Sequence, residues 1–406
     1  MPGFHAIPLP HDEPMPELTA ARAHDPDPLH FWGAGHVVFG MDSLRTLRSL
    51  AAGFSPSRVV VVADEHVIEH PSLQGALDDL ASLCPVEVAR HDGSEPSLGR
   101  AKQLAVAAGG DADLLVAVGG GSTIDIAKAV ALAAAARDRP LESFEGAVHL
   151  DFDPAPLIAV PTTAGTGSEV TGSCVLEDEA ASRKISIRSP KLVPRVAILD
   201  PALLASVPRR VIRATGIDAL AHALEAYHST RANVVTDRMA LGAIARIARS
   251  IVAYYGNPQD RDAAASMQIA ACMAGMAFNS ARVGLAHAIA SAIGPLTGLS
   301  HGECVGLGLR TAMRINLPSR TADRRDLLFH IGCETWQNEH WTSAVLSWLD
   351  DLYAALEFPA TAADAGRRFD IDDAIVDNIL RSGRLDTNPV RLDALQLRRI
   401  LESIRG

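Results

Sequence analysis

The sequence predicts a protein of two domains, an α/β domain with a parallel sheet followed by an all-helical domain. Short β-branched runs alternate with alanine- and leucine-rich stretches up to about residue 205, and the strand-like runs stop after Pro208. A chain of 406 residues is long enough for two or three domains of roughly 150 residues each. We therefore expect a tail at 1–28, the α/β domain at 29–205 and the helical domain at 206–406.

The first 28 residues have a composition of their own. They hold seven of the 24 prolines and almost no periodic apolar pattern, so we expect a mobile tail or a strap over the surface. They also lack a basic segment followed by an apolar core, and no secretory signal is expected.

Five short runs predict the strands of the sheet. Each is mostly apolar and is bounded by turn-forming residues, as in strands that are buried on both faces. Helices between such strands imply parallel βαβ units. Segment 169–187 differs because it alternates and carries charges, and we expect an antiparallel hairpin laid on the sheet. The five runs are 58–63, 85–89, 114–118, 157–160 and 196–199.

The second half is rich in alanine, leucine and arginine and predicts a series of helices. A helical domain beside an α/β domain leaves a cleft between them, which is a common place for a ligand site. The expected helices are 209–228, 233–255, 260–279, 284–294, 301–316, 340–357 and 390–404.

Charge and composition exclude several classes of function. The chain has 37 basic and 48 acidic residues, a net charge of −11 and no run of Lys or Arg, so a general affinity for nucleic acid or an anionic membrane surface is excluded. A hydrophobic share of 48% excludes wholesale disorder. The longest apolar run, 129–136, is far shorter than the roughly 20 residues of a spanning helix. Five scattered cysteines without a C-x-x-C pair indicate a reducing compartment, and we expect a cytoplasmic protein.

A triple glycine follows the 114–118 strand and leads into a helix that we expect to open at Ser122. Because Gly119, Gly120 and Gly121 have no side chains, backbone N–H groups and the helix N-terminus can hold the pyrophosphate of a dinucleotide. The alternative is a tight turn that binds nothing, and the string is not the G-x-G-x-x-G fingerprint.

A second polar loop, 161–169, follows the 157–160 strand. It carries four hydroxyl groups that can donate hydrogen bonds around a nucleotide, although an ordinary polar loop has the same composition. Two such loops at the carboxyl ends of neighbouring strands favour a dinucleotide site. The hydroxyl residues are Thr162, Thr163, Thr166 and Ser168.

Asp64 ends the strand at 58–63. A carboxylate there can accept hydrogen bonds from the adenosine ribose and would repel a 2′-phosphate, which predicts NAD(H) over NADP(H). Capping of the following segment is the alternative role.

One carboxylate and three imidazoles form a candidate metal set. Asp218 and His222 are four residues apart and share one face of a helix. His287 lies in a helix of small residues, and His301 lies at a helix start. These ligand types suit Fe²⁺ or Zn²⁺. A helical Asp/His pair is also common on surfaces, and a chain with 15 histidines offers many combinations.

These strings together resemble the iron-containing (group III) alcohol dehydrogenases over roughly residues 30–400. The resemblance is carried by Gly119-Gly-Gly-Ser122, P-T-T-A-G-T-G-S-E at 161–169, Asp218-x-x-x-His222, Gly284-x-x-His287 and His301-Gly302. It implies a dinucleotide-binding first domain, a metal-binding helical domain, a homodimer, and one divalent metal held by Asp218, His222, His287 and His301. It also implies nucleotide contacts at Asp64, Gly120, Gly121, Ser122, Thr162, Thr163, Thr166, Ser168 and Lys184.

The sequence departs from the family pattern in three places. Ser291 stands where many members have a second histidine that is proposed to relay protons, so the proton path is open. Arg282 stands where relatives usually carry a small or apolar residue. The His301-Gly-Glu303 string is closer to glycerol dehydrogenase and dehydroquinate synthase relatives. We expect a divergent member, with a branch similar to phosphonoacetaldehyde reductases as one candidate.

The expected activity is hydride transfer between NAD(P)(H) and a small alcohol or aldehyde, with the metal acting as a Lewis acid. A guanidinium near a metal site can hold a carboxylate, phosphonate or phosphate, so Arg282 is the expected substrate-binding residue for an anionic tail. A surface arginine is the alternative. A dehydroquinate-synthase-like cyclase that uses NAD transiently, and a catalytically inactive nucleotide-binding protein, are the alternative functions.

Overall fold

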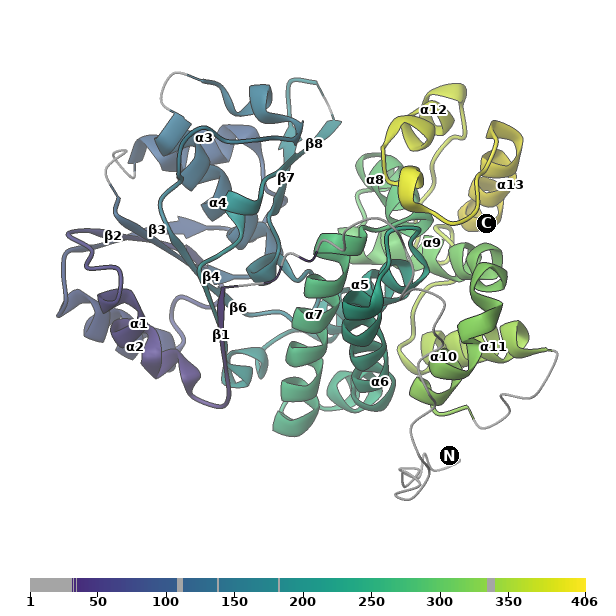
Figure 1. Ribbon diagram of the computed structural model, residues 1–406, viewed down its shortest axis with the longest axis horizontal. Coiled ribbons are helices and arrows are strands. Elements are labelled where there is room, and N and C mark those ends of the chain that lie inside the picture. The colour runs from purple at the N-terminus through teal and green to yellow at the C-terminus, as the bar shows by residue number, and fades with distance from the viewer. Residues whose placement is uncertain are drawn as a thin grey trace.

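The computed structural model consists of an α/β half and a helical half that lie side by side (Figure 1). It describes residues 31, 33, 35–107, 112–136, 139–181, 183–333 and 340–406. The tail expected at 1–28 lies outside the described residues. Among the described helices, none alone is long and apolar enough to cross a membrane; one pair, at 261–281 and 285–297, passes that test only jointly and is bent by 100°.

Six parallel strands form the main sheet, in the order β1-β9-β6-β4-β2-β3. All five predicted strands are confirmed. The sixth, β1, was not predicted from the sequence because it has only four residues and is partly exposed. The strands are β1 (His36–Phe39), β2 (Val59–Asp64), β3 (Val86–His91), β4 (Leu114–Gly119), β6 (Leu157–Pro161) and β9 (Val196–Leu199).

The sheet is buried on both faces, which explains why its strands have no polar alternation. Along β2, Val59, Val61 and Ala63 pack into one apolar cluster, while Val60 and Val62 pack into another. The first cluster includes α1 (Leu47–Ala52) and α2 (Pro71–Ala81), and the second includes α3 (Leu98–Ala107) and α4 (Gly121–Ala136).

The predicted hairpin exists but is placed differently from our expectation. The strands β7 (Ser173–Asp178) and β8 (Arg183–Arg188) pair antiparallel and, with β5 (Gly146–Ala147), form a separate small sheet. Their apolar side chains pack against α4, so this helix lies between the hairpin and the main sheet. Figure 1 shows the hairpin at the side of the α/β half that faces the helical half.

The helical half has three long helices, α5, α6 and α7, that pack against one another, with α8 and α9 packed against α5. The predicted helices are confirmed to within four residues at each end. Two short helices, α10 and α12, were missed because they span only two to three turns. The helices are α5 (Arg209–His228), α6 (Val234–Gly256), α7 (Arg261–Ala281), α8 (Leu285–Thr297), α9 (His301–Asn316), α10 (Arg324–His330), α11 (Trp341–Ala355), α12 (Asp373–Arg381) and α13 (Ala394–Arg405).

Candidate functional site

The four predicted metal ligands come together where three helices meet. Asp218 and His222 lie on α5, His287 lies on α8, and His301 is the first residue of α9. The Asp218 Oδ1 atom lies 3.9 Å from His222 Nε2, 3.4 Å from His287 Nε2 and 3.9 Å from His301 Nε2. The ligand atoms of Asp218, His222 and His287 all lie within 4.8 Å of one another.

The donor atoms of this cluster fit a metal ion. Asp218 and His287 are buried, yet Asp218 Oδ1 and His287 Nε2 have no hydrogen-bond partner among the described residues. Buried polar atoms without partners are rare in proteins, and a cation between these atoms would satisfy both. The side chain of His301 is 35% exposed, against 6% or less for the others. A catalytic metal site needs such an open side for substrate.

The electrostatics prepare two of the imidazoles for metal binding. Burial lowers the pKa of His222 to about 4 and that of His301 to about 3, so both are neutral at pH 7, as a metal ligand must be. Burial also opposes the charged form of His287, but Glu225 and Asp218 outweigh it and raise its pKa to about 9. Burial by itself would raise the pKa of Asp218, yet the three histidines hold it well below its usual range. Binding of a cation would therefore displace a proton from His287.

Glu225 is a site residue that was not singled out from the sequence. Its Oε2 atom lies 2.6 Å from His287 Nδ1, and its two oxygens accept the backbone N–H groups of Gly284 and Ala286 at 2.9 and 2.6 Å. A carboxylate in this position fixes the ring and the tautomer of a metal-binding histidine. The signal in the sequence is the spacing, because Asp218, His222 and Glu225 recur at i, i+4 and i+7 on one helix face.

Close backbone contacts hold the three helices at this meeting point. A Cβ atom at Gly302 would lie 2.3 Å from the carbonyl oxygen of Ala214, so only glycine lets α9 approach α5 this closely. Asn388 accepts the backbone N–H of Leu285 at 3.2 Å and thereby holds the first turn of α8. The side chain of Phe278 stacks on His222, with ring centroids 4.2 Å apart.

The two predicted nucleotide loops are neighbours. Gly119 lies opposite Pro161 in the sheet, and the backbone N–H of Thr162 donates to Gly119 at 3.0 Å. A Cβ atom at Gly121 would lie 2.6 Å from Thr166, and one at Gly119 would lie 2.4 Å from Thr123, so packing alone requires these two glycines.

Gly120 has no such packing role. A Cβ atom there would make only an ordinary contact with Thr163, at 3.6 Å. The helix α4 begins at Gly121, the residue after this glycine, whereas the sequence predicted that it would begin at Ser122. Its first N–H groups have no acceptors within the helix and point toward the loop region, as in phosphate sites.

The remaining predicted nucleotide residues lie in three places, with Thr166 and Ser168 in the second loop, Asp64 at the end of β2 beside β4, and Lys184 on β8. The backbone N–H of Ser168 donates to the Thr166 hydroxyl at 3.3 Å. Asp64 caps the turn after β2, because its Oδ1 atom accepts the backbone N–H of His66 and lies 2.9 Å from the His66 ring. Lys184 forms an ion pair with Glu95 at 2.6 Å, and this pair lies close enough to His301 to affect its pKa. This end of the hairpin therefore lies near His301, one of the predicted metal ligands.

Two of the three departures from the family pattern, Ser291 and Arg282, have clear structural settings. Ser291 is one turn after His287 on α8, and its hydroxyl donates to the His287 carbonyl at 3.0 Å. Arg282 ends α7 with φ 74° and ψ 173°, a conformation that is essentially restricted to glycine. Only three other described residues that are not glycine have a positive φ.

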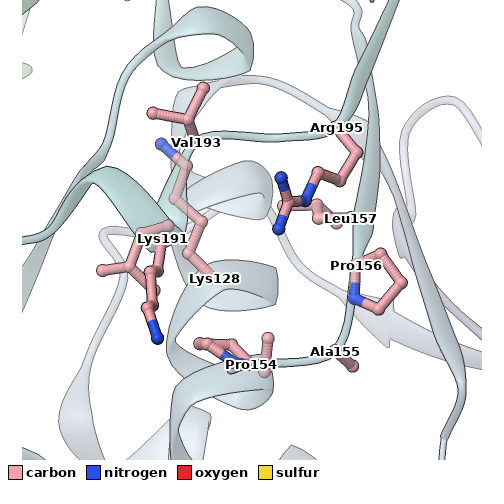
Figure 2. Close-up of a pocket in the computed structure, with 10 residues that line it drawn as sticks. Lys128, Pro154, Ala155, Pro156, Leu157, Lys191, Val193 and Arg195 are labelled. Carbon is pink, nitrogen blue, oxygen red and sulfur yellow. The ribbon is translucent and has the colours of Figure 1, made fainter. Parts of the chain in front are cut away.

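Arg282 lines a cavity of about 250 Å³ that also involves Arg188, Asn279 and His149. Another hollow, beside Lys128, Lys191 and Arg195, measures only about 10 Å³, which is the space of one water molecule (Figure 2). Its lysines are already engaged, since Lys128 donates to the Ser173 carbonyl at 2.8 Å and Lys191 pairs with Asp153. The larger cavity is therefore the better candidate for a substrate.

Two family models match most of the chain. The model described as iron-containing alcohol dehydrogenase matches residues 34–201, and the model of the C-terminal part of the Fe-containing alcohol dehydrogenase family matches residues 212–405. Alcohol dehydrogenase 4 of Schizosaccharomyces pombe is 32% identical over 352 residues, which is 85% of this chain and 81% of that protein.

Solved structures agree with the family models. An alcohol dehydrogenase from Oenococcus oeni is 27% identical, covers 93% of this chain and 100% of its own, and has a TM-score of 0.87. The sulfoacetaldehyde reductase from Bifidobacterium kashiwanohense shares the fold, with 24% identity, coverage of 94% of this chain and 99% of its own, and a TM-score of 0.82. The chain is thus an oxidoreductase that belongs to the iron-containing alcohol dehydrogenase family.

Proposed function

We propose that the protein reduces short aldehydes that carry an anionic tail, using NADH and one divalent metal, Fe²⁺ or Zn²⁺. The proposed ligands are Asp218, His222, His287 and His301, in a helical domain that begins near residue 206. A bound metal would polarise the substrate carbonyl, and the nicotinamide would supply the hydride.

The observation that supports the anionic tail is the backbone of Arg282. A left-handed conformation of this kind costs about 1–3 kcal/mol for a residue other than glycine. The arginine side chain is kept despite that cost, on the wall of a cavity and five residues before a proposed metal ligand. We infer that its guanidinium binds the substrate.

Other residues of the chain have defined parts in this proposal. Glu225 orients His287, and the glycine turn at Gly120 takes the pyrophosphate of the cofactor. Asp64 faces the adenosine ribose and favours NADH over NADPH. Ser291, whose hydroxyl donates to the backbone of its own helix, holds the place of the histidine that is proposed to relay protons or contact substrate in many members. We therefore propose that the proton reaches the product from water at the exposed side of His301.

Steady-state kinetics on the metal-loaded enzyme test this function. We expect oxidation of NADH in step with reduction of an anionic aldehyde, whereas a cyclase would give no net consumption of NADH. The substitution Arg282→Ala should raise the ratio of KM for the anionic aldehyde to KM for a neutral aldehyde of equal length. Arg282→Gly is the matched control for backbone strain, and both variants should change the ratio alike. A wild-type enzyme that prefers the neutral aldehyde would refute the anionic tail.

A further inference from the structure

Arg282 is one of four arginines that gather at the boundary between the two halves. Arg188 ends β8, Arg231 lies between α5 and α6, and Arg384 directly precedes the short 3₁₀ helix η8 (Leu385–Thr387). Within the described part of the chain, none of the four side chains forms a hydrogen bond or an ion pair. This is unusual in a protein with 11 more acidic than basic residues, where other arginines such as Arg183 and Arg310 are paired with carboxylates.

Hydrogen bonds hold the three arginine-bearing segments of the helical half together. The backbone N–H of Thr230 donates to the Thr387 carbonyl at 2.9 Å, which joins the α5–α6 loop to η8. The Thr387 hydroxyl donates to the Val283 carbonyl at 2.8 Å, and the Ser229 hydroxyl donates to the Ala281 carbonyl. Each of Arg231, Arg282 and Arg384 therefore lies within three residues of a position that one of these hydrogen bonds fixes.

The α/β half contributes Arg188 to the same place. The backbone N–H of Ser189 donates to Gly172 at 2.8 Å, and the N–H of Gly172 donates to the Asn279 side chain on α7 at 3.0 Å. The end of β8 is thus tied to the last turn of α7, and Arg188 and Arg282 line the same cavity. The Nε atom of Arg188 is buried without an acceptor among the described residues.

The charges of these arginines repel one another. Burial, followed by Arg188 and Arg231, lowers the pKa of Arg282 to about 10. Burial, followed by the charge of Arg231, lowers the pKa of Arg188. Burial, followed by the charge of Arg188, lowers the pKa of Arg384. The carboxylate that opposes these effects is Glu225, which faces Arg384. The four guanidinium groups together give the cluster an excess of positive charge.

The cluster is adjacent to the proposed metal ligands. Glu225 interacts with Arg384 and bonds directly to His287. Arg282 and His287 belong to one short segment, and the cavity that Arg188 and Arg282 line has a volume of about 250 Å³.

We propose that Arg188, Arg231, Arg282 and Arg384 form one binding site for a tetrahedral dianion, a phosphonate or phosphate monoester, at the tail of the substrate. One guanidinium fork is enough to saturate a planar carboxylate, whereas a tetrahedral dianion has three oxygens that accept from donors on several sides. Guanidinium groups that come from both halves of the molecule can donate to a tetrahedral dianion from several sides. This inference rests on the proposed reductase function and names its substrate class.

Binding of methylphosphonate, an unreactive probe, tests the site in the metal-loaded enzyme with NADH bound. Isothermal titration should give a dissociation constant at least about tenfold lower for methylphosphonate than for acetate. The substitutions Arg188→Gln and Arg384→Gln should each weaken methylphosphonate binding by about tenfold or more and reduce its advantage over acetate. Arg183→Gln, in the same strand but with its side chain paired to Glu145, is the matched control and should bind the probe like the wild type. Thermal unfolding would establish that the variants are folded.

The outcomes separate this inference from the proposed function. Equal binding of acetate and methylphosphonate, or unchanged binding in both variants, would overturn the dianion site even if the enzyme reduces aldehydes with NADH. Loss of methylphosphonate binding on saturation with NADH would also overturn it, because the arginines would then serve the phosphates of the cofactor. Binding as expected in an enzyme that reduces no aldehyde would leave the dianion site standing and refute the reductase.

Discussion

The two sides of the candidate site are built in different ways. The proposed nucleotide side consists of backbone groups at the ends of β4 and β6, which are neighbours in the sheet. The proposed metal side consists of side chains from three helices, with candidate ligands as far apart in sequence as Asp218 and His301. Removal of a ligand side chain should therefore abolish metal binding, whereas addition of a side chain to the glycine turn should weaken nucleotide binding.

The largest effect is expected from loss of a metal ligand. His287→Ala should abolish metal binding and reduce activity by more than the roughly 10–100-fold that is typical for residues behind the ligands. Metal content by atomic absorption and folding by circular dichroism check this expectation. Asp218→Ala should behave alike, because its charge offsets part of the charge of the cation. Full metal occupancy in the His287 variant would exclude this residue as a ligand.

The next effect concerns the carboxylate behind His287. Glu225→Gln should weaken metal affinity by about 10–100-fold, because the amide no longer fixes the ring by a charged hydrogen bond. Competition with a chelator measures the affinity. Glu169→Gln is the matched control, since Glu169 is also buried but burial raises its pKa to about 7 and the amide resembles its neutral form. Equal metal affinity in the two variants would contradict a positioning role for Glu225.

On the nucleotide side, an added methyl group distinguishes phosphate binding from simple packing. Gly120→Ala meets no close neighbour in the protein itself, so we expect normal stability and a KM for NADH raised by about tenfold through a clash with the pyrophosphate. Gly121→Ala would instead collide with Thr166 and should lower the free energy of unfolding by about 1–3 kcal/mol. A normal KM in the Gly120 variant would mean that the triple glycine is only a tight turn.

The smallest effect is expected at Asp64. Asp64→Ser should improve kcat/KM with NADPH relative to NADH by about fivefold, or ~1 kcal/mol, because the carboxylate no longer repels a 2′-phosphate. Glu65→Gln removes an adjacent charge from an exposed position and should leave the preference unchanged. If both substitutions shift the preference equally, Asp64 acts only through the net charge of the region.

Most of the fold could be predicted because its long elements have strong local patterns. The helices at 209–228 and 301–316 and the strand at 196–199 agree with the structure residue by residue. The exceptions are β1, which is only partly buried, β5, which has two residues, and the short helix α12. The position of the β7–β8 hairpin over α4 depends on tertiary packing that alternation does not encode.

The candidate site could be predicted in part, for a related reason. The proposed metal ligands and the glycine turn lie in recognisable strings, so they could be named one by one. Arg188, Arg231 and Arg384 lie in unremarkable segments and become neighbours of Arg282 only through contacts such as Thr387 with Val283. Sequence spacing carries no information on such contacts.

Arg282 has a consequence for the evolution of this chain. A glycine at position 282 would relieve the left-handed backbone, so the more stable sequence is the one without the guanidinium. A lineage that no longer used an anionic substrate would be free to change this residue to glycine, which relieves the strain. If Arg282 binds the substrate as proposed, arginine at this position is a record of selection for substrate recognition, held against the thermodynamic preference of the fold.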